Sequence, residues 1–447
     1  MNQQINVRIN QLNNGEVPKG YKKTDFGIFP SDWVTDKKLK DIGEFGKGKG
    51  LPGNKMQSEG IPCVGYGDIY MKYNFHFEKA MSFVDEETAK DSQPIQKGTL
   101  LFTGTGETAE EIGKCVCYNG EEEIFAGGDI ITFNTEEVDP LFLAYQQYQD
   151  FSLKKKAGFG QGHSVVHIQK GNLENLNIAY PKSAEEQGKI AKILMKWDEA
   201  IELYQKQIEA LQKLKKAYLS VMFPKKGEKT PKYRFKGFTA PWEQRKLGDH
   251  SEIVTGGTPS TGHSEYWNPK EIPWMSSGEI NNKVIYSTEN MISEKGFSNS
   301  SAKWVKEKSV LIALAGQGKT RGTVAINEIS LTTNQSIAAI QPDDFLYYKF
   351  LFQNLEGRYN ELREVSSGDG TRGGLNKQII SDLEVLTPDI QEQLKIGDFL
   401  CCIDNLITLH QRNRDTIIKQ RKVLQQYLLN GIVRVKTNSN GLMEKQY

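Results

Sequence analysis

The chain has 447 residues, of which 37% are hydrophobic and 25% are charged, and its formal net charge is +1. This length allows two or three domains with cores of their own, no apolar run is long enough to cross a bilayer, and the polar first residues (MNQQINVRINQLNN) lack the apolar core of a signal peptide. The five cysteines form no C-x-x-C pair, so neither a disulfide framework nor a zinc ribbon is indicated, and we expect a reducing, cytoplasmic setting.

The first part of the chain, residues 1–182, is predicted to be a globular head of the α+β class. Short β-rich runs at 99–103 and 130–133 are typical of strands, and glycine turns separate such runs. A helix is expected at 141–151. The basic, glycine-rich stretch at 154–164 (KKKAGFGQGHS) is expected to be a loop before the final strand.

Two long helices are predicted at 183–223 and at 389–430, the second followed by a tail at 431–447. In both, apolar residues recur at alternating spacings of four and three. This spacing is the seam of a coiled coil, whereas a helix packed on a head needs only a broad apolar stripe. We therefore expect the helices to pair as an antiparallel coiled coil. The predicted seam residues are Ile190, Leu194, Trp197, Ile201, Ile208, Leu211, Ile396, Leu400, Ile403, Ile407, Ile417 and Leu424.

A linker at 224–232 leads to a second α+β head at 233–388, which repeats the first at a distance of roughly 206 to 212 residues. The strongest match begins each long helix, where a proline is followed by Glu-Gln and then Lys-Ile in both copies (EEQGKI and QEQLKI). The repeat predicts two related heads held apart by a two-helix rod, with a pseudo-two-fold axis across the rod.

The stretch VLIALAGQGKT, Val310 to Thr320, has the end of a phosphate-binding P-loop, G-K-[ST]. The first glycine of that motif would fall on Ala313, which tolerates a positive φ poorly. The copy in the first head, GTLLFTGTGET, has Glu107 where the lysine would be. We therefore predict a glycine turn between two strands rather than a nucleotide site.

Charge is unevenly distributed along the chain. Residues 206–246 contain 12 Lys and Arg against three acids, and residues 78–139 contain 15 acids against four lysines. Opposed patches of this kind suggest more than one macromolecular partner, although solvated faces that cancel would look the same. Basic residues near the glycine-rich loops could contact DNA phosphates or guanine edges, and each could also be a plain surface charge. These candidates are Lys154, Lys155, Lys156, Lys319, Arg321, Arg363 and Arg372.

Two dissimilar heads, each closed by the Pro, Glu-Gln, Lys-Ile pattern and a coiled-coil helix, resemble the specificity subunit of a type I restriction–modification system. The resemblance covers about residues 20–430. It implies two target-recognition domains, each reading one half of a split site on double-stranded DNA. It also implies two methyltransferase subunits as partners and, optionally, two restriction subunits, with no membrane involved.

The resemblance places S-adenosylmethionine, ATP and Mg in those partner subunits, so no cofactor, metal ligand or catalytic residue is expected in this chain. Fixed spacing between two heads suits a split site with a fixed gap, as dimeric readers suit spaced half-sites. The alternatives are a coiled-coil scaffold protein without DNA specificity and a divergent P-loop NTPase.

Overall fold

The computed structural model describes residues 3–51, 53–162, 165–225, 227–316, 320–364 and 374–436. The chain forms two compact units, unit 1 (Met1–Leu203 and Arg414–Tyr447) and unit 2 (Tyr204–Asn413). Two long helices, α7 (Ala184–Met222) and α12 (Ile390–Leu429), each begin in one unit and end in the other. Within the described ranges, every helix is too short or too polar to cross a bilayer.

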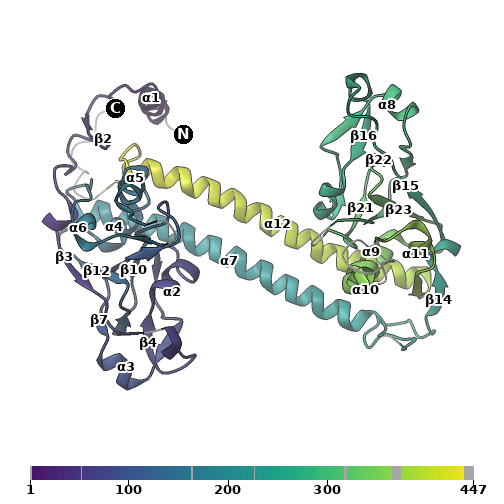
Figure 1. Cartoon of the computed structure of the whole chain (residues 1–447), viewed down its shortest axis with the longest axis horizontal. Coiled ribbons are helices and arrows are strands. Elements are labelled where there is room, and N and C mark those ends of the chain that lie inside the picture. Colours follow the sequence, from purple (N-terminus) through teal and green to yellow (C-terminus); the bar gives the residue numbers. More distant parts are fainter. Residues whose placement is uncertain are drawn as a thin grey trace. The chain divides into compact units, whose positions relative to one another are not determined.

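The head of unit 1 is built from short strands and helices (Figure 1). Its strands are β1 (Tyr21–Thr24), β2 (Gly27–Pro30), β3 (Glu44–Lys47), β4 (Ile61–Val64), β5 (His76–Phe77), β6 (Ser82–Val84), β7 (Gln93–Ile95), β8 (Leu100–Thr103), β9 (Thr105–Gly106), β10 (Cys115–Tyr118), β11 (Ile124–Ala126), β12 (Ile130–Asn134) and β13 (Val166–His167). Its helices are α1 (Gln3–Asn13), α2 (Tyr66–Met71), α3 (Glu86–Lys90), α4 (Pro140–Gln146), α5 (Asp150–Phe159) and α6 (Lys170–Leu173).

The head of unit 2 is also built from short strands and helices (Figure 1). Its strands are β14 (Glu243–Lys246), β15 (Ser251–Thr255), β16 (Ile272–Met275), β17 (Val284–Ile285), β18 (Asn290–Ile292), β19 (Trp304–Val305), β20 (Ser309–Ala313), β21 (Val324–Asn327), β22 (Leu331–Thr333), β23 (Ile337–Pro342) and β24 (Glu384–Thr387). Its helices are α8 (Glu294–Ser298), α9 (Tyr348–Gly357), α10 (Tyr359–Glu364) and α11 (Lys377–Ser381).

The two heads share one sheet topology, which confirms the internal repeat and the α+β class. Each contains a five-stranded and a four-stranded sheet, ordered β3-β12-β8-β10-β5 and β6-β4-β11-β7 in unit 1 and β15-β23-β20-β21-β17 and β18-β16-β22-β19 in unit 2. The parallel strand pairs also correspond. The pair β5–β10 of unit 1 matches β17–β21 of unit 2, and the pair β4–β11 matches β16–β22.

The inner strands of the five-stranded sheet in each head are buried on both faces. In β8, Leu100 and Phe102 face the cluster that contains α4 and the long helices, whereas Leu101 faces the four-stranded sheet. In β20, Val310 likewise faces the cluster that contains α9 and the long helices, whereas Leu311 faces the four-stranded sheet. Successive side chains of a strand point to opposite faces, so a strand covered on both sides is apolar throughout. This explains the continuous apolar runs in the sequence.

The predicted strand–turn–strand reading of the P-loop-like stretch is confirmed. Strand β20 pairs antiparallel with the next strand, β21, and its copy β8 pairs antiparallel with β10. A P-loop instead leads from its strand into a helix whose N-terminus holds the phosphates. Lys319 itself lies outside the described residues.

The expected loop at 154–164 is wrong in its first half, because residues up to Phe159 belong to α5. The single helix expected at 141–151 is two, α4 and α5, separated by residues 147–149. The second head repeats this break between α9 and α10. Three consecutive lysines are compatible with a helix. The prediction took the glycines after them as the sign of a loop and therefore ended the helix too early.

The Glu-Gln pair at the start of each long helix fastens that helix to its head. In unit 1, the side chain of Gln187 donates to Pro181 O (2.8 Å) and accepts from the backbone N–H of Asp139, where α4 begins (2.7 Å). In unit 2, Gln393 makes the same two bonds with Pro388 O and Tyr347 N. One buried amide thus joins two helix starts in each unit.

The neighbouring glutamate binds an arginine that follows the other long helix. Arg234, after α7, makes a two-pronged ion pair with Glu392 at 2.9 and 2.6 Å. Arg434, after α12, does the same with Glu186 at 2.6 and 2.8 Å. Glu392 is fully buried and Glu186 is 2% exposed. A guanidinium suits this place because its fork matches both carboxylate oxygens.

The two long helices run antiparallel in both units. In unit 2, the ring of Tyr218 lies 4.9 Å from that of Phe399, and the ring of Tyr204 lies 5.6 Å from that of His410. In unit 1, Leu194 shares a core cluster with Leu428. All twelve seam residues predicted from the 4-3 spacing are buried or half-buried.

Replacing Arg234 by alanine should strongly destabilise unit 2, because it leaves the Glu392 carboxylate buried and unpaired. Removing one partner of a buried pair costs about 3–5 kcal/mol. Thermal unfolding of the full chain should show this as a lowered midpoint. Arg245→Ala is the control, since Arg245 pairs with the exposed Glu243. Equal midpoints for the two variants would contradict the buried clamp.

Candidate nucleic-acid interface

Four loops of unit 1 meet at one end of the five-stranded sheet. The backbone N–H of Gly104, after β8, donates to Asp129 O (2.8 Å), and that of Ile168 donates to Gly104 O (3.0 Å). The N–H of Gly128 donates to Gly50 O (3.1 Å). Loops that bond to one another in this way form a firm surface at the sheet end. We call the following segments the unit 1 loop corner: 48–51, 104–106, 127–129 and 165–168.

Unit 2 has the same corner with different residues. The N–H of Leu314, after β20, donates to Ser336 O (2.8 Å), and that of Leu375 donates to Leu314 O (3.0 Å). The N–H of Gly257 donates to Thr333 O (2.8 Å). The unit 2 loop corner consists of segments 256–258, 314–316, 334–336 and 374–375. Backbone bonds hold both corners, so their side chains are free to differ.

Glycine is required where the loops of a corner touch. A Cβ on Gly48 would lie 1.7 Å from Gly127 O, and one on Gly256 would lie 2.0 Å from Thr333 O. Both distances are far below van der Waals contact. Gly48, in the glycine-spaced stretch FGKGKG (Phe45–Gly50), is therefore required for the close packing of two loops.

The side chains exposed at the two corners are of types that read base edges. Unit 1 presents Lys49 and His167, whose Nδ1 lies 3.3 Å from Thr105 Oγ1. Unit 2 presents Gln335, whose Oε1 accepts from Thr258 Oγ1 at 2.6 Å. Lysine donates to guanine acceptors and glutamine can pair with adenine. Sequence reasoning missed these residues, because only the fold brings the loops together.

Most of the basic candidates lie near the second short helix of each head. Lys154 and Lys155 are exposed on α5. Arg363 lies on its counterpart α10, where its guanidinium carbon is 5.6 Å from the ring of Tyr359. The loop containing Arg321 packs on α10, since a Cβ on Gly322 would lie 3.5 Å from Arg363 Cγ. Lys319 and Arg372 lie outside the described residues.

Lys156 is a correction to the predicted set of phosphate-binding residues. Its side chain is 1% exposed, and its ammonium donates to Gly113 O (2.9 Å) and lies 5.7 Å from the ring centre of Tyr148. Burial lowers the pKa of Lys156 to about 8. A side chain held in this way cannot reach a phosphate, so it supports the fold of α5 instead.

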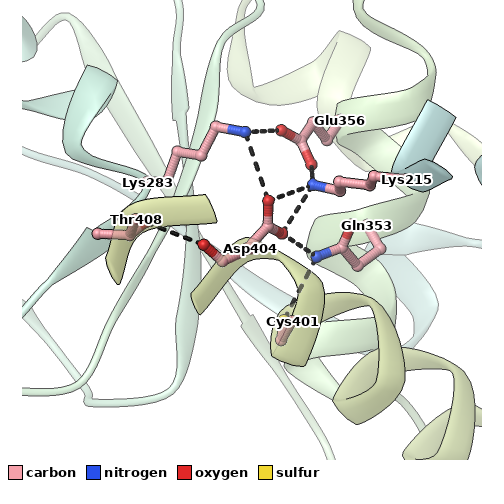
Figure 2. A network of polar contacts seen from close by, with 7 residues as sticks. All are labelled: Lys215, Lys283, Gln353, Glu356, Cys401, Asp404 and Thr408. Atoms are coloured by element: carbon pink, nitrogen blue, oxygen red, sulfur yellow. Dashed lines mark hydrogen bonds and ion pairs between the residues drawn. The ribbon is translucent and has the colours of Figure 1, made fainter. Parts of the chain in front are cut away.

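An ion-pair network with a buried centre fixes the unit 2 head on the long helices (Figure 2). The ammonium of Lys215, on α7, donates to both carboxylate oxygens of Asp404, on α12, at 2.7 Å. The head contributes Gln353, which donates to Asp404 at 2.7 Å, together with Glu356 and Lys283, which pair with each other and with the central charges. We call these five residues the unit 2 node.

Charges balance within the unit 2 node. Burial by itself would raise the pKa of Glu356, but the ammonium groups of Lys215 and Lys283 outweigh it and hold that pKa below its usual value. Burial would lower the pKa of Lys283, and the carboxylates of Glu356 and Asp404 raise it instead. Glu356 and Lys283 are therefore both charged at neutral pH.

In unit 1, the equivalent positions of the repeat hold a cluster of different residue types. Arg421, on α12, binds Asp198, on α7, at 2.9 and 3.2 Å. The hydroxyl of Tyr145 donates to Asp198 at 2.6 Å. The Arg421 guanidinium lies 3.9 Å from the ring centre of Phe75, which contacts Tyr148 edge-on at 4.6 Å. These five residues form the unit 1 node.

Comparison with protein families gives one match over most of the chain. The model described as "Type I restriction modification DNA specificity domain" matches residues 30–213 and again residues 240–420. Each match covers one head and most of the long helix that follows it.

Curated relatives and a solved structure agree with this match. A Methanocaldococcus jannaschii protein named as the MjaX type I restriction enzyme specificity subunit is 26% identical, over 94% of this chain and 98% of the relative. The MjaVIII specificity subunit of the same organism is 26% identical, over 76% of this chain and 80% of its own. The S subunit of a type I restriction–modification system from M. genitalium has a similar fold, with a TM-score of 0.62 and 16% identity, over 94% of this chain and 100% of its own.

The stability of the chain should depend on the titration of Lys156. The pKa in the fold is about 8, and in the unfolded chain it is about 10.4, so between these values the unfolded state binds more protons. The contribution of Lys156 to the free energy of unfolding is therefore lowest below pH 8. It rises by about 2–3 kcal/mol from pH 8 to pH 10. Denaturant unfolding of the wild type and of Lys156→Met should diverge in that window, and parallel pH profiles would contradict the burial.

Proposed function

The chain belongs to the type I restriction–modification DNA specificity family, and on this premise we propose that each of its two loop corners reads one half of a bipartite site on double-stranded DNA. It is a specificity subunit with two recognition domains. Within the proposal, the unit 1 loop corner reads one half-site and the unit 2 loop corner reads the other.

One observation carries the proposal: the two heads have the same sheet order and corner backbone but unlike corner side chains. A constant backbone that carries variable polar side chains suits the major groove, where each base pair presents its own pattern of donors and acceptors. Because His167 and Lys49 have no chemical equivalents in Gln335 and Thr258, the two half-sites should differ. The exposed lysines of α5 and the region of α10 would contact phosphates, which position the head without reading sequence.

We further propose that methyl transfer, ATP-driven translocation and DNA cleavage belong to partner subunits, and that this chain is itself non-catalytic. S-adenosylmethionine, ATP and Mg would then bind those partners, and this chain would hold no cofactor. The proposed assembly has two methyltransferase subunits and, optionally, two restriction subunits on one copy of this chain.

Exposed leucines on the long helices support two copies of one partner. Leu203 in unit 1 is 57% exposed, and its repeat counterpart Leu409 in unit 2 is 52% exposed. Leu214 is also 44% exposed, whereas Leu219 is partly buried against the unit 2 core. Equivalent apolar side chains in both units suit the same partner surface twice.

Substitutions at one corner should change one half-site only. In complexes with the methyltransferase subunits, His167→Ala should relax base choice in the first half-site, and Gln335→Ala should relax it in the second. Each lost base contact is worth about 1–3 kcal/mol of discrimination. Sequencing of methylated sites measures both effects, with Gln244→Ala, on exposed β14, as the control for glutamine loss. Unchanged half-sites in both variants would refute reading by the corners.

The lengths of α7 and α12 should set the gap between half-sites. One heptad inserted between Tyr204 and Gln205, with another between Leu409 and His410, keeps the seam in phase because Tyr204 and His410 are partners. The insertion adds roughly 10 Å of helix, or about three base pairs at 3.4 Å each. Methylation mapping should then find the same half-sites at the longer gap. An active variant that keeps the original gap would show that something else sets it.

A further inference from the structure

The two nodes occupy equivalent positions of the repeat although their residues differ. Asp198 and Asp404 each lie eleven residues after the glutamine of the Glu-Gln pair, Gln187 or Gln393. The cations Lys215 and Arg421 each lie 28 residues after the same glutamines, on the helix opposite the aspartate they bind. The long helices therefore contribute one aspartate and one cation to each node.

The head residues of the nodes also correspond. Phe75 and Lys283 each directly precede the equivalent strands β5 and β17. Tyr145 and Gln353 both donate to the aspartate, at 2.6 and 2.7 Å. Tyr148 and Glu356 each follow that residue by three positions.

The two heads surround the aspartate–cation pair with different residue types that are neutral in sum. In unit 1, the ring of Phe75 covers the Arg421 cation, as aromatic faces can, and the neutral ring of Tyr148 packs edge-on against Phe75. In unit 2, a lysine and a glutamate take those two places, and their opposite charges cancel. Both head contributions are neutral in sum, so the pairing between aspartate and cation is undisturbed in either unit.

We infer that the aspartate–cation pair of the long helices is a common socket that seats either kind of head and holds it at a fixed place on the helices. A head fits when it brings a hydrogen-bond donor for the aspartate and a pair of residues that is neutral in sum. Given the proposed reading of a split site, the socket keeps the gap between half-sites constant while the heads vary. The two residues of the neutral pair must therefore change together.

The decisive test converts the unit 2 node to the chemistry of unit 1. Glu356→Tyr alone leaves Lys215 and Lys283 facing one aspartate, and Lys283→Phe alone leaves two carboxylates facing one lysine. The double variant K283F/E356Y restores neutrality with the aromatic pair of unit 1. The equivalent side chains fit there, because Lys283 and Glu356 line an open cavity of about 1080 Å³.

Complexes of the full chain with methyltransferase subunits are compared for yield and for the gap lengths of the sites they methylate. Each single variant should lower the fraction of methylated sites with the wild-type gap by about tenfold, through lost assembly or through acceptance of gaps one base pair longer or shorter. The double variant should return to within about threefold of the wild type, with unchanged half-site bases. Lys215→Arg, which copies Arg421, should also keep the wild-type gap.

Each outcome decides the inference. Asp398→Asn provides the control, because it removes one charge from a more exposed ion pair, with Lys349, on the same long helix and should leave the gap distribution unchanged. A double variant no better than the worse single variant, whether in assembly or in gap length, would overturn the socket. So would single variants that behave like the wild type. Failure of the wild-type complex to methylate any split site would instead refute the proposed function.

Discussion

The buried carboxylates at the starts of the long helices, Glu186 and Glu392, are the constraint on which each unit depends. A carboxylate cannot stay charged in a protein core without a partner, and the arginine that supplies the partner follows the other long helix in sequence. The start of one helix and the segment after the other are thereby brought to one place in each unit. The neighbouring glutamine then connects that place to the head, through the first residues of α4 or α9.

Given these attachments, each head is free to vary where it does not touch the helices. The loop corners are held by backbone hydrogen bonds and close glycine contacts, which specify geometry without specifying side chains. The nodes follow the same rule on the helix side, where the aspartate and the cation are constant in type. Recognition chemistry and attachment chemistry are thus carried by different residues of one head.

Much of this architecture was predictable from the sequence, because it rests on periodicity and repetition. The 4-3 spacing identified the helix seam, and the repeat of the Glu-Gln pair identified the two heads. The loop corners were not predictable, since they join segments as far apart as Gly50 and Ile168. Burial of Lys156 was hidden because the two residues before it, Lys154 and Lys155, are exposed lysines. The nodes were hidden because Phe75 and Lys283 share a position but no chemistry.

The central claim is that two heads of one architecture read two different half-sites. Sequencing of methylated bases, in DNA exposed to the wild-type chain with its methyltransferase subunits, tests it most directly. The account predicts a modified sequence made of two unlike specific parts with a constant number of unspecified base pairs between them. One continuous specific sequence, or two identical parts, would contradict it.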